Sequence, residues 1–203
     1  WLNNPILMRK DKDAEYFETL EIDLNEITEP ILCAPNDPDD AVLLSEVCGN
    51  KIDEVFIGSC MTNIGHFRAA GELLKDNNNK LNSKLWIAPP TKMDEKKLKD
   101  EGYYSIFDKI GARLETPGCS LCMGNQARVE DNSRVLSTST RNFPNRLGKG
   151  ADVYLASAEL SAITSILGEI PSYEKYMEYF KNIENKREEI FDYISFDKLQ
   201  EYK

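Results

Sequence analysis

Short apolar segments alternate with helix-forming segments in this chain, and the apolar segments begin near residues 54, 84 and 113, about 30 residues apart. The first of them, Glu-Val-Phe-Ile at 54–57, reads as a buried strand that ends at Gly58. An interval of this length is typical of a strand–helix–strand unit, in which the two strands are parallel. The sequence therefore predicts an α/β fold, a three-layer domain with a parallel sheet covered by helices.

The remaining elements follow from the same patterns. Strands are expected at 84–88, 113–115, 134–137 and 152–155, and helices at about 63–74, 91–110 and 158–167. We expect one α/β domain over residues 1–171, of which 1–51 is an acidic N-terminal lead-in, and a C-terminal helix and tail over 172–203. The chain begins at Trp1 and not at methionine, so we also expect it to be part of a longer protein.

The charge is unevenly distributed. The chain has 35 Asp and Glu against 25 Lys and Arg, a net charge of −10, which disfavours a general nucleic-acid binder. The first 60 residues hold this whole excess, whereas residues 113–146 carry five arginines against three acids. The arginine-rich segment is where an anion site is expected.

Several classes of protein are disfavoured by composition. No run approaches the roughly 18 apolar residues of a membrane span, and the N-terminus lacks the pattern of a signal peptide, so a cytoplasmic protein without a membrane partner is predicted. Five cysteines are an odd number for a disulfide framework. Cys33 and Cys48 are expected to be small buried apolar residues.

The other three cysteines form a candidate metal site. Cys119 and Cys122 make a C-x-x-C, and Cys60 ends a different predicted strand. Structural zinc sites and ordinary iron–sulfur clusters take four protein ligands, so three cysteines leave one position open, as in a catalytic metal site. A zinc site completed by His66 and a thioredoxin-like redox pair are the alternatives, and the redox pair fits less well because no helix clearly begins at the motif.

The loop at 137–146 is a candidate anion site. It follows a predicted strand with four hydroxyl residues and then offers Arg141 and Arg146 around a proline-containing turn. The planar guanidinium group binds a carboxylate or phosphate through two hydrogen bonds. Because this loop lies at the same predicted sheet edge as the thiols, we expect a polycarboxylate or phosphorylated ligand beside the metal.

Four segments together resemble the aconitase superfamily, in particular its cluster-binding portion. They are Ile-Gly-Ser-Cys at 57–60 with Asn63, Pro-Gly-Cys-Ser-Leu-Cys-Met-Gly-Asn at 117–125, Ser-Thr-Arg-Asn-Phe-Pro-Asn-Arg at 139–146, and the segment 30–40. Met61 is inserted where many members read Gly-Ser-Cys-Thr-Asn, which points to the B branch of the superfamily.

The resemblance implies a fold of the aconitase type and a 4Fe-4S cluster. Cys60, Cys119 and Cys122 match the three cluster ligands, and one iron has no protein ligand and binds the substrate. Arg141 and Arg146 match the arginines that bind substrate carboxylates. Asn63, Asn125, Ser139 and Thr140 are the further residues that the matching motifs place around the cluster and the substrate.

The implied reaction is the reversible isomerisation of citrate to isocitrate through cis-aconitate, as in the tricarboxylic acid cycle. The B branch also interconverts 2-methyl-cis-aconitate and 2-methylisocitrate, a step of propanoate metabolism. No position matches the family's general-base serine or catalytic histidines, so the chain is expected to need the remaining domains of a full-length protein for catalysis.

Three alternatives remain open from the sequence. The first is a structural zinc module that binds a partner. The second is binding of mRNA by the cluster-free form, known for aconitases as a family but weakly supported by the small positive segment. The third is another superfamily member that acts on a related hydroxy acid.

Overall fold

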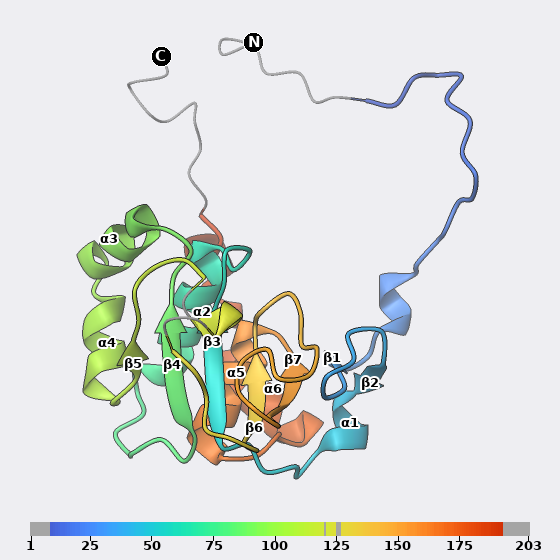
Figure 1. Cartoon of the computed structure of the whole chain (residues 1–203). Coiled ribbons are helices and arrows are strands. Elements are labelled where there is room, and N and C mark those ends of the chain that lie inside the picture. The colour runs from blue at the N-terminus through green and yellow to red at the C-terminus, as the bar shows by residue number, and fades with distance from the viewer. Residues whose placement is uncertain (1–8, 120, 125–126, 193–203) are drawn as a thin grey trace. The chain divides into compact units, whose positions relative to one another are not determined.

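The computed structural model describes residues 9–119, 121–124 and 127–192, and the chain divides into two units (Figure 1). The described part of the first unit, residues 9–28, contains the 3-10 helix η1 (Leu24–Glu26), whose first turn is capped by the Asp23 carboxylate. The second unit, Glu29–Asp192, contains the sheet and the candidate site.

The sheet of the second unit has seven strands in the order β2-β1-β7-β6-β3-β4-β5. Their bounds are β1 (Ile31–Cys33), β2 (Ala41–Leu43), β3 (Glu54–Gly58), β4 (Lys84–Ala88), β5 (Arg113–Leu114), β6 (Arg134–Ser137) and β7 (Asp152–Leu155). The five strands from β3 to β7 are parallel, which confirms the predicted α/β class. The sheet is mixed, however, because β1 pairs antiparallel with both β2 and β7.

Seven α-helices and a second 3-10 helix lie among the described residues of this unit. They are α1 (Leu44–Val47), α2 (Ile64–Leu74), α3 (Lys92–Asp100), α4 (Tyr103–Lys109), η2 (Leu121–Met123), α5 (Ala158–Leu167), α6 (Tyr173–Glu184) and α7 (Arg187–Ile190). The single helix predicted at 91–110 is two helices, because Gly102 adopts a φ of 87° between α3 and α4. No helix in the described ranges is long and apolar enough to cross a bilayer.

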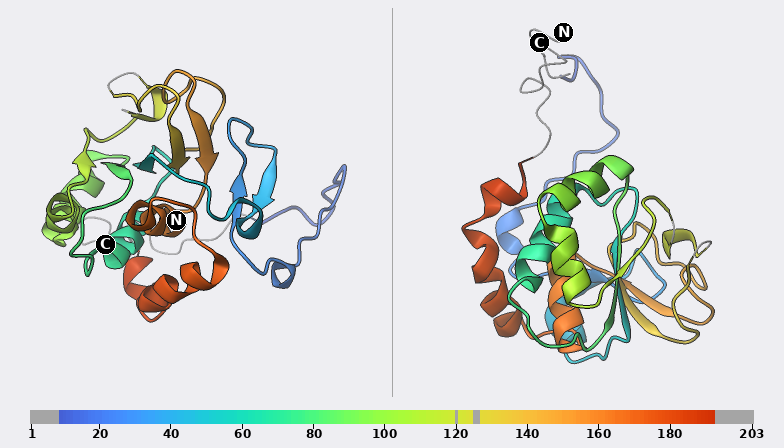
Figure 2. Two further views of the ribbon diagram at one scale, coloured as in Figure 1. Left: turned by 90° about the horizontal axis from the view of Figure 1, so that it is seen from below. Right: turned by 90° about the vertical axis from the view of Figure 1, so that its left-hand side faces the viewer.

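The two faces of the sheet are covered differently. Val55 and Ile57 point to a core shared with α2, α5 and α6, whereas Phe56 and Trp86 point to a second core on the opposite face. That second core is closed by η2 and the loops on either side of β6, and Figure 2 shows helices on one side of the sheet and these loops on the other. The connections after β5 and β6 are rich in Gly, Pro and polar residues, and they form the loops that the sequence predicted.

Side-chain caps fix where the main helices begin. Asn63 accepts a hydrogen bond from the Gly65 amide (2.9 Å) at the start of α2, and Ser157 accepts one from Leu160 (3.2 Å) at the start of α5. α2 is the next element after β3, so its Asn63 cap marks the end of the intervening loop, which holds Cys60.

Candidate functional site

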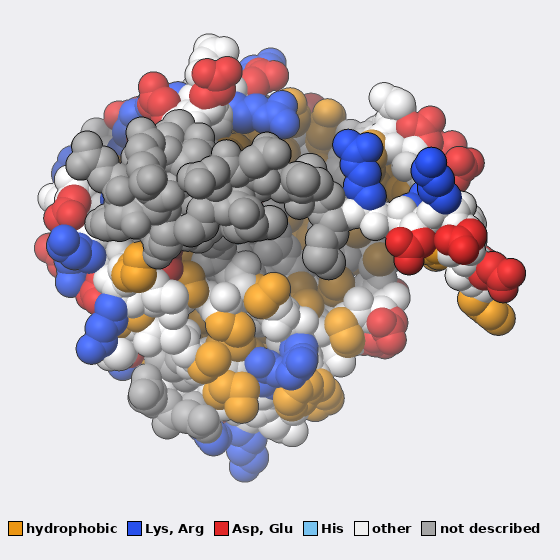
Figure 3. Space-filling view, turned by 90° about the horizontal axis from the view of Figure 1, so that it is seen from above, with side chains coloured by type: hydrophobic (Ala, Val, Ile, Leu, Met, Phe, Trp, Pro, Cys, Tyr) orange, Lys and Arg blue, Asp and Glu red, His pale blue; other side chains and the backbone are white. Residues whose placement is uncertain are grey.

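The carboxyl ends of the parallel strands carry the three loops that the sequence singled out. Cys60 follows β3, Cys119 and Cys122 lie in the loop after β5, and Arg141 and Arg146 lie in the loop after β6. Figure 3 looks onto this edge and shows hydrophobic side chains gathered around a basic group. Ligand sites of open α/β sheets form at this edge, where loops from neighbouring strands meet.

The three cysteines are free thiols, and Cys119 lies within electrostatic range of both Cys60 and Cys122. Cys60 and Cys119 are exposed, and Cys122 is buried. Desolvation of the sulfur atom raises the pKa of Cys119, and the neighbouring Cys60 and Cys122 raise it further. The positive charge of Arg146 lowers this pKa. Two loops that are far apart in the sequence therefore bring Cys60 close to the C-x-x-C.

The turn at Cys60 requires two unusual backbone features. A side chain at Gly58 would place its Cβ 2.4 Å from the Ala88 carbonyl oxygen and 2.7 Å from the Phe56 ring, so only glycine fits there. The next residue, Ser59, is fully buried and has a φ of 127°, a conformation that residues with side chains rarely adopt. These two positions direct Cys60 out of the sheet toward the other thiols.

Three hydrogen bonds fix the conformation of the loop that carries the C-x-x-C. The Gly118 amide donates to the Pro89 carbonyl (2.9 Å), and the Gly124 amide donates to Leu121 (2.8 Å) to close η2. Arg128 Nε donates to the Gly124 carbonyl (2.7 Å). Arg128 could not be identified as a site residue from the sequence, because nothing in the sequence around it indicates that it binds a carbonyl four residues away.

The two predicted arginines differ in their surroundings. Arg146 donates from Nε to the Cys122 carbonyl (2.7 Å) and from Nη2 to Cys122 Sγ (3.2 Å), and it lies 5.1 Å from the centroid of the Phe143 ring. Arg141 is exposed, and its side chain has no hydrogen bond or ion pair with another described residue. Arg141 therefore presents a free guanidinium group to an anion, whereas part of Arg146 is engaged by the cysteine loop.

The other predicted site residues are placed as follows. Asn63 is exposed and caps α2, and Ser139 is buried and donates to the Arg141 carbonyl (3.1 Å). Thr140 is exposed beside Arg141. Asn125 lies outside the described residues.

Asn142 supports the arginine loop and was not identified from the sequence. Its fully buried side chain donates from Nδ2 to the carbonyls of Ala34 and Val153, both at 2.8 Å. It thereby joins the segment after β1 to β7 and holds the residue next to Arg141 in place. A single asparagine gives no sequence signal for this role, because Ala34 is 108 residues away.

The structure contradicts the expected burial of Cys33 and Cys48 and gives little support to the zinc alternative. Cys48 is exposed and Cys33 is half-buried, so the expectation that both are buried is wrong. Cys33 ends the short strand β1, and Cys48 follows the short helix α1. His66 is half-buried on α2, as predicted for a packing residue. In the described ranges, no three His, Cys, Asp or Glu side chains converge as ligands of one metal ion.

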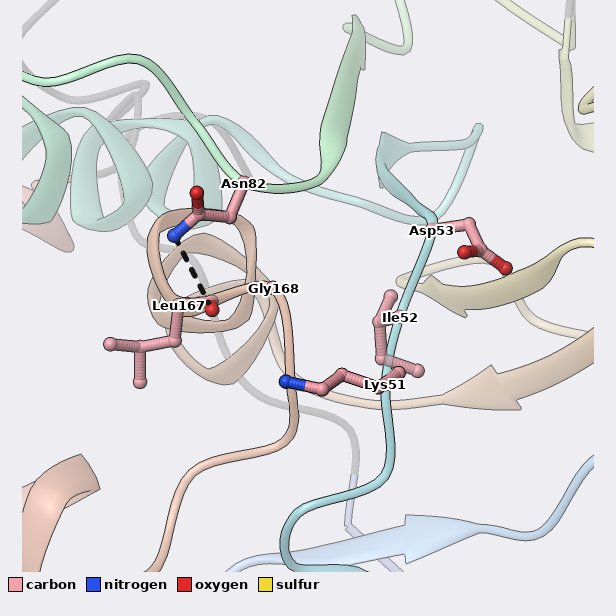
Figure 4. Close-up of a pocket in the computed structure, with 6 residues that line it drawn as sticks. All are labelled: Lys51, Ile52, Asp53, Asn82, Leu167 and Gly168. Carbon is pink, nitrogen blue, oxygen red and sulfur yellow. Dashed lines mark hydrogen bonds between the residues drawn. The ribbon is translucent and has the colours of Figure 1, made fainter.

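A cavity of about 530 Å³ lies away from the thiols, at the amino end of β3 and the carboxyl end of α5 (Figure 4). Its lining residues are Lys51, Ile52, Asp53, Asn82, Leu167 and Gly168. Its polar groups already have partners: Asn82 donates to the last carbonyls of α5, Asp53 accepts from the Arg134 amide, and Lys51 pairs with Glu169. The cavity is therefore explained by the ends of these elements.

The sequence of this chain is similar to those of known proteins. The aconitase family (aconitate hydratase) matches residues 3–168, and the chain belongs to this family. The whole chain is similar to aconitate hydratase B, with 62% identity to the protein of Pseudomonas aeruginosa and 60% to that of Escherichia coli. It spans about 23% of the length of either relative. The large subunit of 3-isopropylmalate dehydratase from Clostridium kluyveri is 37% identical over 81% of the chain and 40% of that protein.

Proposed function

We propose that this chain is the cluster-binding part of a hydro-lyase of the aconitate hydratase B type. The observation that carries the proposal is that Cys119 lies near both Cys60 and Cys122, so that free thiols from two loops are neighbours, with the Arg146 guanidinium group beside them. The proposed substrates are citrate, cis-aconitate and isocitrate, and also 2-methylisocitrate.

The residues fit an iron–sulfur cluster better than a single ion. All three candidate ligands are thiols, the ligand type that iron–sulfur clusters use. Each thiolate binds a different iron of a cluster, so the sulfur atoms need not converge on one point, as a zinc site would require. We propose a 4Fe-4S cluster held by Cys60, Cys119 and Cys122. When bound, it supplies a Lewis-acidic iron without a protein ligand for the substrate hydroxyl.

The arginines then have separable roles. Arg141 binds a substrate carboxylate through two hydrogen bonds, because its guanidinium group is exposed and unpaired. Arg146 orients the cysteine loop through the Cys122 carbonyl and donates to the Cys122 sulfur. Neither Arg141 nor Arg146 forms an ion pair or hydrogen bond with an acidic side chain among the described residues. Their positive charge therefore favours the binding of a tricarboxylate anion at this edge of the sheet.

Anaerobic reconstitution of the 203-residue chain with iron and sulfide tests the proposal. We expect a visible absorption band and, after one-electron reduction of the cluster, an EPR signal that changes when citrate is added. Replacing any one of Cys60, Cys119 or Cys122 by Ser should abolish cluster uptake, whereas Cys48→Ser, which removes another exposed thiol, should leave it unchanged.

Two results would contradict the proposal. Purified protein that holds one tightly bound zinc per chain and takes up no iron would favour the zinc module. Equal iron uptake by the Cys60→Ser and Cys48→Ser variants would show that the iron binds elsewhere.

A further inference from the structure

Beneath the Cys60 turn lies a network of hydroxyl groups that contains no metal ligand. Ser59 and Thr62 are buried and Thr138 is half-buried. The Met61 amide donates to Ser59 Oγ (3.3 Å), and Ser59 Oγ lies 3.1 Å from Thr62 Oγ1. The residues on both sides of Cys60 are therefore bound to this network.

The positions of the hydroxyl protons follow from the acceptors. Thr62 Oγ1 and Thr138 Oγ1 each donate to the Gly58 carbonyl oxygen at 2.9 Å, and together they occupy both of its lone pairs. Because Thr62 has given its only proton to Gly58, Ser59 Oγ must be the donor in the contact between Ser59 and Thr62. Every hydroxyl proton of the network thus has one acceptor.

Thr138 is the residue that joins this network to the arginine loop. Pairing between β3 and β6 ends at Phe56 and Ser137, and the Thr138 amide then donates to the Phe56 carbonyl (3.0 Å). Beyond that point the Thr138 side chain continues the ladder: its Oγ1 accepts from the Gly58 amide (2.8 Å) and donates to the Gly58 carbonyl. One side chain therefore fixes both polar groups of Gly58, immediately before the unusual φ of Ser59.

We propose that Thr138 is a positioning residue for the cluster. Its hydroxyl group holds the turn over residues 58–62 in the conformation that brings Cys60 to Cys119, and it ties this turn to the loop of Arg141. The inference rests on the proposed function, since positioning Cys60 matters only when the three thiols share a cluster.

The test compares three variants of the full 203-residue chain. Thr138→Val keeps the shape of the side chain and removes the hydroxyl, and Thr138→Ser keeps the hydroxyl. Thr164→Val is the matched control, because Thr164 Oγ1 is buried on α5 and has no hydrogen-bond partner among the described residues. Hydrogen exchange of the peptide covering 58–62 is measured without the cluster, and loss of the reconstituted cluster to an iron chelator is followed by visible absorption.

In Thr138→Val we expect the Met61 and Thr62 amides to exchange roughly 10-fold faster and the cluster to be lost roughly 10-fold faster. A change of this size is within what the loss of the two hydrogen bonds between Thr138 and Gly58 allows. Thr138→Ser should restore both rates, and Thr164→Val should change neither. The inference would be overturned if Thr138→Val had the wild-type rates of hydrogen exchange and cluster loss. It would also be overturned if hydrogen exchange became faster to the same extent in every peptide of the chain.

The two proposals fail in distinguishable ways. Normal cluster uptake by the wild type with unchanged cluster loss in Thr138→Val refutes the role of Thr138 alone. No cluster uptake by the wild type refutes the proposed function, and with it the positioning role, whatever the exchange rates are.

Discussion

Glu54 is an acidic side chain in the middle of the sheet, and its two oxygens serve different parts of the fold. Its side chain is 3% exposed, and it accepts from Trp86 Nε1 and from the Glu130 amide, both at 2.6 Å. The second contact anchors the segment that follows the cysteine loop to β3. A carboxylate satisfies both donors because each of its oxygens is only an acceptor.

Glu54→Gln should therefore destabilise the chain although its shape is kept. The amide nitrogen of glutamine would face one of the two N–H donors and leave it without an acceptor, which costs about 1–3 kcal/mol. Urea denaturation at pH 7 measures the loss of unfolding free energy. Glu130→Gln is the control, because that side chain is 78% exposed and its ion pair with Lys84 adds little. Equal stability of the two variants would contradict this account of Glu54.

At the scale of elements, Arg68 connects α2 to α3 and α7. Its side chain is 7% exposed and forms two hydrogen bonds of 2.8 Å with the Glu101 carboxylate at the end of α3. It also donates to the carbonyls of Ile190 and Asp192 at the end of α7. The turn over residues 58–62 leads into α2 through its cap, Asn63. The Arg68–Glu101 pair therefore stabilises the helix that follows this turn.

The pair predicts a dependence of stability on pH. The Arg68 hydrogen bonds lower the pKa of Glu101, so its contribution is complete above the ordinary glutamate pKa of about 4.3 and is lost as the pH falls through the lowered value. Glu101→Gln should cost about 2–4 kcal/mol at pH 7, because it leaves a buried guanidinium group without its charge partner. The difference from the wild type should shrink well below pH 4. Urea denaturation across this range measures it, and a difference that does not change with pH would contradict the assignment.

The long parallel strands could be predicted, and the short antiparallel ones could not. All five residues of β3 are buried, so its apolar run is unambiguous. β1 and β2 have three residues each and are partly exposed. The segment that follows β1 is joined to β7 and the residue before it by side-chain hydrogen bonds from Asn36 and Asn142. Such contacts between distant segments carry no local pattern.

At the scale of the whole molecule, the topology explains why the residues of the candidate site could be predicted to lie at one edge of the sheet. Parallel strands bring their carboxyl ends to one edge, so placing Cys60 and Cys119 after two such strands was enough to predict that they meet. The engagement of Arg146 with Cys122 could not be predicted, because it depends on the fold of η2 and on the close approach of Gly124 to the Arg146 carbonyl.

The chain carries the proposed cluster cysteines and substrate arginines at one edge of its sheet but no residue that matches the family's general base. We therefore predict that it binds the cluster and the substrate without completing the reaction. Hydration and dehydration need a base that removes a proton from carbon, and no position of this chain matches the family's base. We expect the reconstituted chain to change its EPR signal with citrate and to form no cis-aconitate, which ultraviolet absorption would detect. The Cys60→Ser variant, treated with iron and sulfide in the same way, gives the background from free iron. Formation of cis-aconitate above this background would contradict the prediction, because it would show that the 203 residues contain a base that removes the carbon-bound proton.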